Sequence, residues 1–82
     1  MARTLSSARH RRLAELLIAH REAAGPTQTE VARALKRHQP FVSNLESGQW
    51  RVDVVELLYL AAVIGFDANA ILDAVAEVPR EG

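Results

Sequence analysis

Signals that start and stop helices recur at short intervals along this chain, and they limit it to a set of short helices. Thr27 and Glu30 form a capping box, in which each side chain satisfies a backbone amide of the other residue. Asp53 and Glu56 form a second capping box with the same spacing. Gly25-Pro26 stops the helix that precedes the first box. Because no segment shows the alternation of a half-buried strand, the sequence predicts an all-α fold.

The segment before Gly25 predicts a first helix with one apolar face. Ser6 and Ser7 precede it and can cap its first backbone amides. Apolar side chains then recur at helical spacing, so they should face the core of the domain. These apolar positions are Leu13, Leu16, Leu17 and Ala24.

Two short helices follow, joined by a tight break. The first begins after Thr27 and continues for about two turns, and the break is formed by residues 36–38. The second begins near Gln39, where Pro40 is tolerated because the amide hydrogen that proline lacks is not needed in a first turn. Apolar residues of the first of these helices should face the core: Val31, Ala32 and Leu35.

The rest of the chain predicts two more helices. A strongly apolar helix runs from Val54 to Ile64, and Gly65 suits the left-handed residue that closes it. Asp67 caps a fifth helix, and Pro79 stops it. The apolar positions of this fifth helix are Ile71, Leu72, Val75 and Val78.

Length and composition fit one small intracellular domain. With 82 residues, we expect a single domain over residues 1–82, with its core at about 7–78. The sequence has no cysteine, which excludes a disulfide framework and a cysteine-based zinc site. No apolar run reaches the roughly 18 residues of a membrane span, and the N-terminal MARTLSSARHRR lacks the apolar stretch of a signal peptide. We therefore expect a cytoplasmic protein.

The net charge of zero conceals an uneven distribution along the chain. Residues 1–51 hold nine Lys and Arg against four Glu, a net charge of +5. Residues 52–82 hold one Arg against six acidic residues, a net charge of −5. A small domain polarised in this way can present a positive face to an anion such as nucleic acid. Scattered solvated charge would explain the mixture of signs but not their segregation.

The segment TQTEVARALKRHQPFVSNLESG, residues 27–48, predicts two short helices joined by a tight turn, the second polar on its outer side. This segment resembles the XRE family, the Cro and phage-repressor-like helix-turn-helix domains. The resemblance covers roughly residues 10–75, because LLYLAAVIGFDANAIL is similar to the helix pair that follows in the family. It implies a compact five-helix, lambda-repressor-like domain with its helix-turn-helix at about 27–47.

Individual residues match family positions within this motif. Ala32 takes the position where the two helices touch and a large side chain would collide. Val42 and Leu45 match the core positions of the recognition helix, and Glu46 and Gly48 match its end. Together these matches form a far more specific pattern than any one residue.

The motif departs from the family at its turn and at the start of the recognition helix. Lys36 stands where the family often has Gly, and a positive φ angle there would cost on the order of 1 kcal/mol. His38 replaces the usual Ser or Thr cap and is a weaker one. Pro40 and Phe41 replace small or polar residues. We expect the fold to tolerate these changes, but the family's base contacts do not transfer directly.

The resemblance implies a recognition helix that begins at Gln39 and enters the major groove of double-stranded DNA. Gln and Asn side chains suit bidentate contact with adenine, and Gln39 lies in the first turn, which points into the groove. Phe41 either presses its ring on a thymine methyl group or packs between helices. The candidate base-contacting residues are Gln39, Pro40, Phe41, Ser43 and Asn44.

A second group of residues suits contact with DNA phosphates. Gln28 matches a family position that commonly holds a phosphate, where its amide and the helix terminus attract an anion. Trp50 packs over the core or lies on the sugar-phosphate backbone. The other candidates flank the recognition helix: Arg37, Ser47, Gln49 and Arg51. Arginines near the N-terminus either extend this basic face or are solvated surface charges: Arg9, Arg11 and Arg12.

No pattern in the sequence predicts a metal site, a cofactor or catalysis. His10, His20 and His38 lack the spacing of metal ligands and are expected to be exposed surface residues. The chain has no phosphate-cradling Gly loop, no HExxH motif and no arrangement of nucleophile, base and acid. We therefore expect a protein that is not an enzyme.

The apolar stripe of the fifth helix has two interpretations. It either closes the core of one domain or forms a dimer interface through Ile71, Leu72, Val75 and Val78. A domain this small makes few DNA contacts alone, and family members read two half-sites one helical turn apart. We therefore favour a homodimer on a palindromic operator.

We expect the protein to be a sequence-specific DNA-binding transcriptional regulator. A repressor would act by occluding a promoter, and an activator would contact polymerase through an acidic patch. The alternative is a protein-binding antiactivator or antitoxin that uses the same fold to capture a partner protein, such as a regulated transcription factor. Zero net charge, the Pro40-Phe41 pair and Trp50 favour this alternative.

Overall fold

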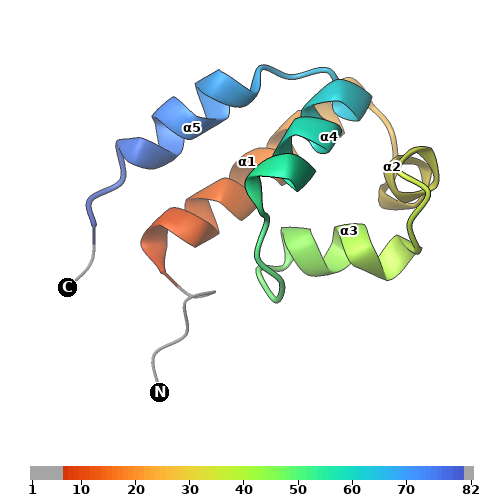
Figure 1. Ribbon diagram of the computed structural model, residues 1–82, viewed down its shortest axis with the longest axis horizontal. Helices are drawn as coiled ribbons and strands as arrows, with labels where there is room; N and C mark the ends of the chain where they lie inside the picture. Colours follow the sequence, from red (N-terminus) through yellow and green to blue (C-terminus); the bar gives the residue numbers. More distant parts are fainter. Residues whose placement is uncertain (1–6, 81–82) are drawn as a thin grey trace.

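A computed structural model describes residues 7–80. Within this part of the chain the protein is all-α, as predicted, and no strand is present. The five helices are arranged around one core (Figure 1), with α3 along one edge of the molecule and α4 crossing in front of α1. Their bounds are α1 (Ala8–Ala24), α2 (Gln28–Ala34), α3 (Gln39–Glu46), α4 (Val54–Ile64) and α5 (Ala68–Ala76).

The predicted caps start the helices where the sequence places them. The Thr27 hydroxyl accepts from the amide of Glu30, and the Glu30 carboxylate accepts from the amide of Thr27. Asp53 and Glu56 make the same two reciprocal bonds at the start of α4. Both capping boxes are therefore confirmed. Side chains also cap two other helices: Ser7 caps α1 and Asp67 caps α5, whereas Ser6 lies outside the described residues.

Two helices end at the predicted glycines, but two apolar residues near helix ends, Ala24 and Val78, do not lie where the sequence predicted. Gly65 closes α4 with a φ angle of 95°, as predicted, and Gly25 closes α1 with a φ angle of 106°. Ala24 was expected in the core, but it is exposed, like the residues on either side of it. The helix α5 ends at Ala76, so Val78 lies beyond it in the following segment.

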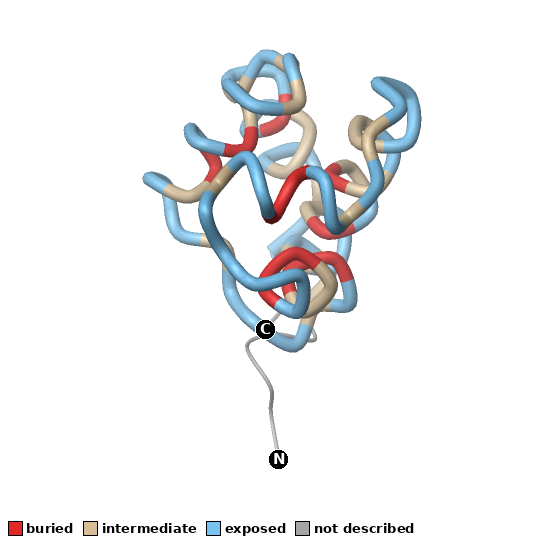
Figure 2. The backbone as a smooth tube through the Cα atoms, turned by 90° about the vertical axis from the view of Figure 1, so that its right-hand side faces the viewer, coloured by how far each residue is buried: buried red, intermediate tan, exposed pale blue. Residues whose placement is uncertain are grey.

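One apolar cluster connects all five helices, and Figure 2 shows that the buried segments gather where the helices face one another. Leu17 of α1 meets Val31 and Ala32 of α2 in this cluster. The cluster also contains Phe41, Val42 and Leu45 of α3, Leu57 and Leu60 of α4, and Ile71 of α5. Each helix therefore contributes a different inward stripe to the same core.

The turn between α2 and α3 is tight. Ala32 is buried where these helices meet, as predicted, and its carbonyl accepts from the amide of Arg37 at 2.8 Å. Lys36 has a φ angle of 60°, so a side chain that carries Cβ occupies the left-handed region. His38 precedes α3 without a side-chain capping bond, which agrees with its weak capping ability. The tight turn is therefore formed at a cost in backbone strain at Lys36.

The helix α4 has the predicted bounds but an unexpected orientation of its apolar residues. Only Leu57 and Leu60 of this helix are buried. Its other large apolar side chains are exposed to solvent: Val54, Val55, Leu58, Tyr59 and Val63. No helix within residues 7–80 has both the length and the apolar character needed to cross a membrane.

Candidate nucleic-acid interface

The helix α3 presents a polar side outward and an apolar side to the core. Val42 and Leu45 are buried and anchor the helix, as predicted. The Ser43 hydroxyl donates to the Pro40 carbonyl at 3.2 Å. Four predicted base-contacting residues are at least partly accessible: Gln39, Pro40, Ser43 and Asn44. The outward side of α3 is therefore a surface of amides and hydroxyls.

A chain of side-chain hydrogen bonds fixes the start of α3 to α2. The Gln39 Nε2 donates to Gln28 Oε1 at 3.0 Å. The Gln28 Nε2 in turn donates to Glu46 Oε1 at 2.8 Å, at the other end of α3. Two residues that the sequence assigned to different tasks, a base contact and a phosphate contact, thus touch each other directly.

The Glu46 carboxylate also binds Arg21 of α1. Arg21 Nε donates to Oε2 at 2.6 Å and Nη2 donates to Oε1 at 3.1 Å, while Nη1 donates to the Pro26 carbonyl at 3.1 Å. The side chains of Arg21 and Glu46 are only 13 % and 7 % exposed, so water screens the pair weakly. The hydrogen bond with Glu46 raises the pKa of Arg21, against the lowering effect of burial. This pair ties the last turn of α3 to α1.

The sequence analysis assigned no role to Arg21. A local signal was present, because Arg21 follows the buried Leu17 by four residues and so lies on the inward side of α1. A charged residue on an inward helical side needs a partner of opposite charge. Only the three-dimensional structure identifies that partner as Glu46, 25 residues further along the chain.

One carbonyl group accepts several of the hydrogen bonds that shape the loop after α3. The carbonyl of Asn44 accepts from the amides of Gln49 at 3.0 Å and Trp50 at 3.2 Å, and also from the Ser47 hydroxyl at 3.2 Å. Gly48 has a φ angle of 83°, which lets the chain turn at this point. As a result, Ser47, Gln49 and Trp50 are all exposed beside the end of α3.

Phe41 lies in the core, and this corrects its assignment as a base-contacting residue. Its side chain is 7 % exposed, and its ring centroid lies 6.3 Å from that of Trp50. The guanidinium of Arg37 stacks over the Phe41 ring at 4.0 Å, and Nη2 of Arg37 lies 3.6 Å from Glu56 Oε2. Of the two interpretations of Phe41, packing between helices is the one that fits. Arg37 is half-exposed, and its side chain contacts Phe41 of α3 and Glu56 of α4.

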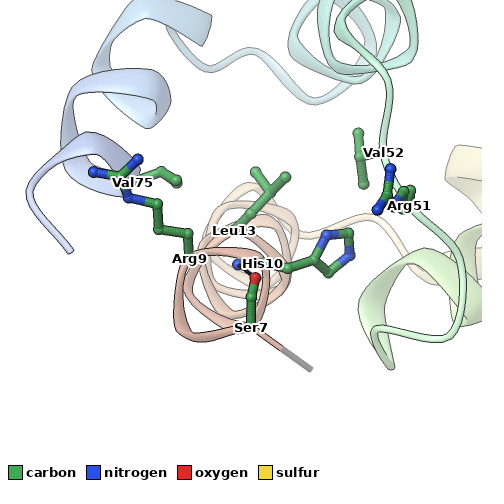
Figure 3. Close-up of a pocket in the computed structure, with 7 residues that line it drawn as sticks. All are labelled: Ser7, Arg9, His10, Leu13, Arg51, Val52 and Val75. Atoms are coloured by element: carbon green, nitrogen blue, oxygen red, sulfur yellow. Dashed lines mark hydrogen bonds between the residues drawn. The ribbon is translucent and has the colours of Figure 1, made fainter. Parts of the chain in front are cut away.

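Arg51 lies in a separate hollow between the start of α1 and the loop after α3 (Figure 3). The hollow has a volume of about 410 Å³. Arg9 borders it and donates to the carbonyls of Ala76 at 3.2 Å and Val78 at 2.8 Å, so this side chain caps the end of α5. The residues around the hollow are Ser7, Arg9, His10, Leu13, Arg51, Val52 and Val75.

Two of the three histidines are less exposed than expected. His10 is half-buried, and its Nε2 atom is shielded from solvent without a hydrogen-bond partner in the described part of the protein. His20 is also half-buried, and its ring lies 5.1 Å from that of Phe66. His38 is exposed, as predicted. Among residues 7–80 no cluster of His, Asp and Glu has the arrangement of a metal site.

The predicted dimer stripe on α5 is only partly available. Ile71 is 1 % exposed and belongs to the core, which corrects its assignment to an interface between copies. Val75 and Val78 are half-buried. Leu72 alone among these four residues is well exposed. The inward orientation of α5 therefore satisfies most of its apolar stripe within one molecule.

Comparisons with known proteins agree with this architecture. A family model described as a helix-turn-helix domain matches residues 12–73. Among solved structures, the chain is similar to an XRE-family like protein from Pseudomonas syringae pv. tomato str. DC3000, with 42% sequence identity and a TM-score of 0.80. The match covers 88% of this chain and 89% of that one. No curated protein matches the chain. The chain belongs to the XRE-type helix-turn-helix domain family.

Proposed function

We propose that this protein is a sequence-specific DNA-binding transcriptional regulator that places α3 in the major groove. The observation that carries the proposal is the fixed polar side of α3. Gln39 is held by Gln28, and Gln28 by the buried Glu46. A recognition side chain that is already oriented loses less conformational entropy when it binds. This arrangement favours selective reading of base edges over loose attraction to phosphates.

Gln39 keeps the groups that adenine recognition requires. Its amide nitrogen has two N–H groups, of which the bond to Gln28 uses one, and its oxygen is an acceptor. Adenine offers an acceptor at N7 and a donor at N6 in the major groove. We propose that Gln39 makes this bidentate contact, and that Ser43 and Asn44 contribute further along the same side.

Phosphate contacts would come from both flanks of α3. We assign them to Gln28 before it, and to Ser47, Gln49, Trp50 and Arg51 after it. Ser47, Gln49 and Trp50 are exposed next to the end of α3, and Arg51 is exposed at the hollow that borders the start of α1. Arg37 is exposed and stacks over the Phe41 ring, so a phosphate contact would use the free edge of its guanidinium. These contacts fix the position of the protein on the duplex and carry no sequence information of their own.

The protein would act as a homodimer on a palindromic operator in the cytoplasm and repress by occluding a promoter. One copy has a short recognition helix of eight residues, which can reach few base pairs. Two copies related by a two-fold axis would read two half-sites about one helical turn apart. An acidic patch that contacts polymerase would instead make the protein an activator.

The rival proposal, capture of a partner protein as an antiactivator or antitoxin, has less support than the sequence suggested. It relied on Phe41 as part of an exposed apolar patch, and Phe41 is buried. Trp50 is 48% exposed and still favours it. The exposed apolar side of α4 could also receive a protein, but it leaves α3 available for DNA.

The decisive experiment is selection of binding sites from a random-sequence DNA pool at low and moderate salt. We expect enrichment of a palindrome with half-sites about ten base pairs apart. The same selection with Gln39→Ala should lose its preference at one position of each half-site. If neither protein enriches any sequence, the proposal of a DNA-binding regulator fails and capture of a protein becomes the better explanation.

A further inference from the structure

The outward side of α4 is an unbroken apolar surface. Its large side chains have exposed fractions from 38 % at Val63 to 65 % at Val54. Leu57 and Leu60, on the opposite side of the helix, fill the core. One further small apolar residue, Ala62, lies on the outward side. We refer to the following residues as the α4 face: Val54, Val55, Leu58, Tyr59, Ala62 and Val63.

The α4 face stands out from the rest of the described surface. Outside it, the only large apolar side chains with comparable exposure are Trp50 and Leu72. Single exposed apolar residues are normal on proteins, whereas a contiguous group on one helix marks an interaction site. The polar residues of α4 do not interrupt it, because Glu56 lies at its edge against Arg37.

We propose that the α4 face is the surface through which two copies of this chain pair. The proposal rests on the homodimer of the proposed function and specifies where that homodimer forms. The exposed area of the face is on the order of 500 Å² per copy, so pairing would bury roughly 1,000 Å² in total, the lower limit of a specific interface.

The absence of charge on the face favours an identical partner. In a two-fold dimer the same patch meets itself, so a charged residue near the axis faces its own like charge. None of the residues of the α4 face is charged, and its only polar side-chain atom is the Tyr59 hydroxyl. The face is therefore compatible with itself, and the two charged residues beside it, Arg37 and Glu56, are paired with each other.

The shape of the surface also favours a second copy of the chain as the partner. A hollow of about 90 Å³ opens beside Tyr59, and its other walls are Leu35, Arg37, Phe41 and Glu56. This volume accommodates one aliphatic side chain. Leu58 and Val55 project from the adjoining α4 face. A self-complementary surface needs both projecting side chains and a hollow to receive one, and buried pockets of this kind hold the strongest contacts of an interface.

The position of α4 leaves the DNA-binding side open. In Figure 1, α3 follows one edge of the molecule, while α4 crosses in front of α1. Gln39 is exposed and belongs neither to the α4 face nor to the residues around the hollow beside Tyr59, so a second copy on the α4 face need not cover it. Pairing through α5 would have to use Leu72 almost alone, because Ile71 is in the core.

The first test is the molar mass in solution, measured by size-exclusion chromatography with light scattering over a concentration series. The wild-type protein should approach twice the 9.0 kDa of one chain as its concentration rises. Leu58→Glu should remain at the single-chain mass over the same range, with an unchanged circular dichroism spectrum. Leu72→Glu, an equally exposed leucine on α5, is the matched control and should pair like the wild type.

Three results would overturn the proposal: a wild-type protein that stays monomeric at high concentration, a Leu58→Glu variant that still dimerises, or a Leu72→Glu variant that becomes the monomer. The first result would leave the face without its proposed occupant. The other two would move the interface to another surface. If Leu58→Glu fails to fold, the cross-linking test below decides instead, because it introduces no charged residue.

Cysteine cross-linking locates the two-fold axis directly, because the chain has no cysteine of its own. A single cysteine at Val55 or Leu58 can form a disulfide only with another copy. Such a bond requires Cα atoms about 4.4–6.8 Å apart, so only a position near the axis reacts rapidly under mild oxidant. We expect at least one of these variants to cross-link much faster than Leu72→Cys. Equal or slower rates at both α4 positions would contradict the proposal.

These tests separate the α4 pairing from DNA binding. If the wild-type protein dimerises through α4 but selects no DNA sequence, the interface stands and the regulator function fails. If it selects an unrepeated DNA site and stays monomeric, the regulator function stands and the α4 pairing fails.

Discussion

Gln39 Nε2 donates a hydrogen bond to Gln28 Oε1 at 3.0 Å, joining the first residue of α3 to the first residue of α2. This contact crosses the turn of the helix-turn-helix and ends at the buried Glu46 carboxylate. The orientation of the proposed base-reading side chain therefore depends on Gln28 of α2 and on Glu46 at the other end of α3. Changes in Gln28 should alter sequence preference as well as phosphate binding.

The first prediction separates base reading from phosphate binding. Gln39→Ala should weaken binding to the selected operator by about 1–3 kcal/mol, the usual value of one bidentate base contact. Binding to unrelated DNA should change little, because Gln39 would not hold a phosphate. Gln49→Ala is the matched control and should weaken both equally. Fluorescence anisotropy at fixed salt measures these affinities, and a uniform loss in Gln39→Ala would contradict its assigned role.

The second prediction concerns the pair between Arg21 and Glu46. Replacing Arg21 with Ala leaves the buried Glu46 carboxylate without its charged partner, with only the bond from Gln28 remaining, and should cost about 3 kcal/mol of unfolding free energy. Arg12→Ala is the control: its pair with Glu15 is 3.5 Å long and largely exposed, so the loss should stay below about 1 kcal/mol. Urea denaturation followed by circular dichroism measures both. Similar losses in the two variants would show that burial does not strengthen the pair.

The pH dependence of this contribution follows from the direction of the shift. The folded-state pKa of Arg21 is raised, so the stability that it adds is fully present below its unfolded pKa and is lost only as pH rises through the folded pKa. Both values lie in the strongly alkaline range. Titration of Arg21 should therefore leave the stability difference between the wild type and Arg21→Ala unchanged between about pH 6 and 9. Urea denaturation at several pH values measures it.

The third prediction tests the strain at Lys36. Its φ angle of 60° is costly for any residue with a Cβ atom but not for glycine. Lys36→Gly should raise the unfolding free energy by about 0.5–1 kcal/mol, after subtracting the greater entropy of an unfolded glycine. Lys36→Ala keeps the strain and should show no such gain. A stabilisation by alanine equal to that by glycine would point to charge or solvation instead.

The fourth prediction distinguishes packing from DNA contact at Phe41. Because the ring is buried against Trp50 and Arg37, Phe41→Ala should cost about 3–5 kcal/mol of unfolding free energy. Phe41→Leu retains much of the apolar volume and should lose less stability. Operator affinity of the folded Phe41→Leu variant should match the wild type in the anisotropy assay. A large loss of affinity at full folding would restore the base-contacting role.

Local sequence signals predicted the helices well because each signal acts within four residues. The Thr27–Glu30 and Asp53–Glu56 boxes form as predicted, since capping depends on backbone amides close in sequence. The inward positions of Val42 and Leu45 were implied by the resemblance to the helix-turn-helix family and are correct, whereas Phe41 was left between two interpretations.

Contacts between distant segments could not be predicted in this way. The partner of Arg21 lies 25 residues away, and nothing local identifies it. The orientation of α4 was also hidden, because a helix that is apolar on nearly all sides gives no periodicity from which to choose its inward side. The same ambiguity made the α5 stripe look like an interface, although Ile71 is committed to the core.

The bonds from Arg9 to the carbonyls of Ala76 and Val78 join the first turn of α1 to the end of α5, nearly 70 residues later. Ile71 enters the same core as Leu17, so α1 cannot complete its packing without α5. During synthesis α1 therefore cannot complete its packing until residues 71–78 have left the ribosome. The native structure of this domain forms after these residues are translated, and a ribosome stalled before them would display an unfinished core to chaperones and proteases.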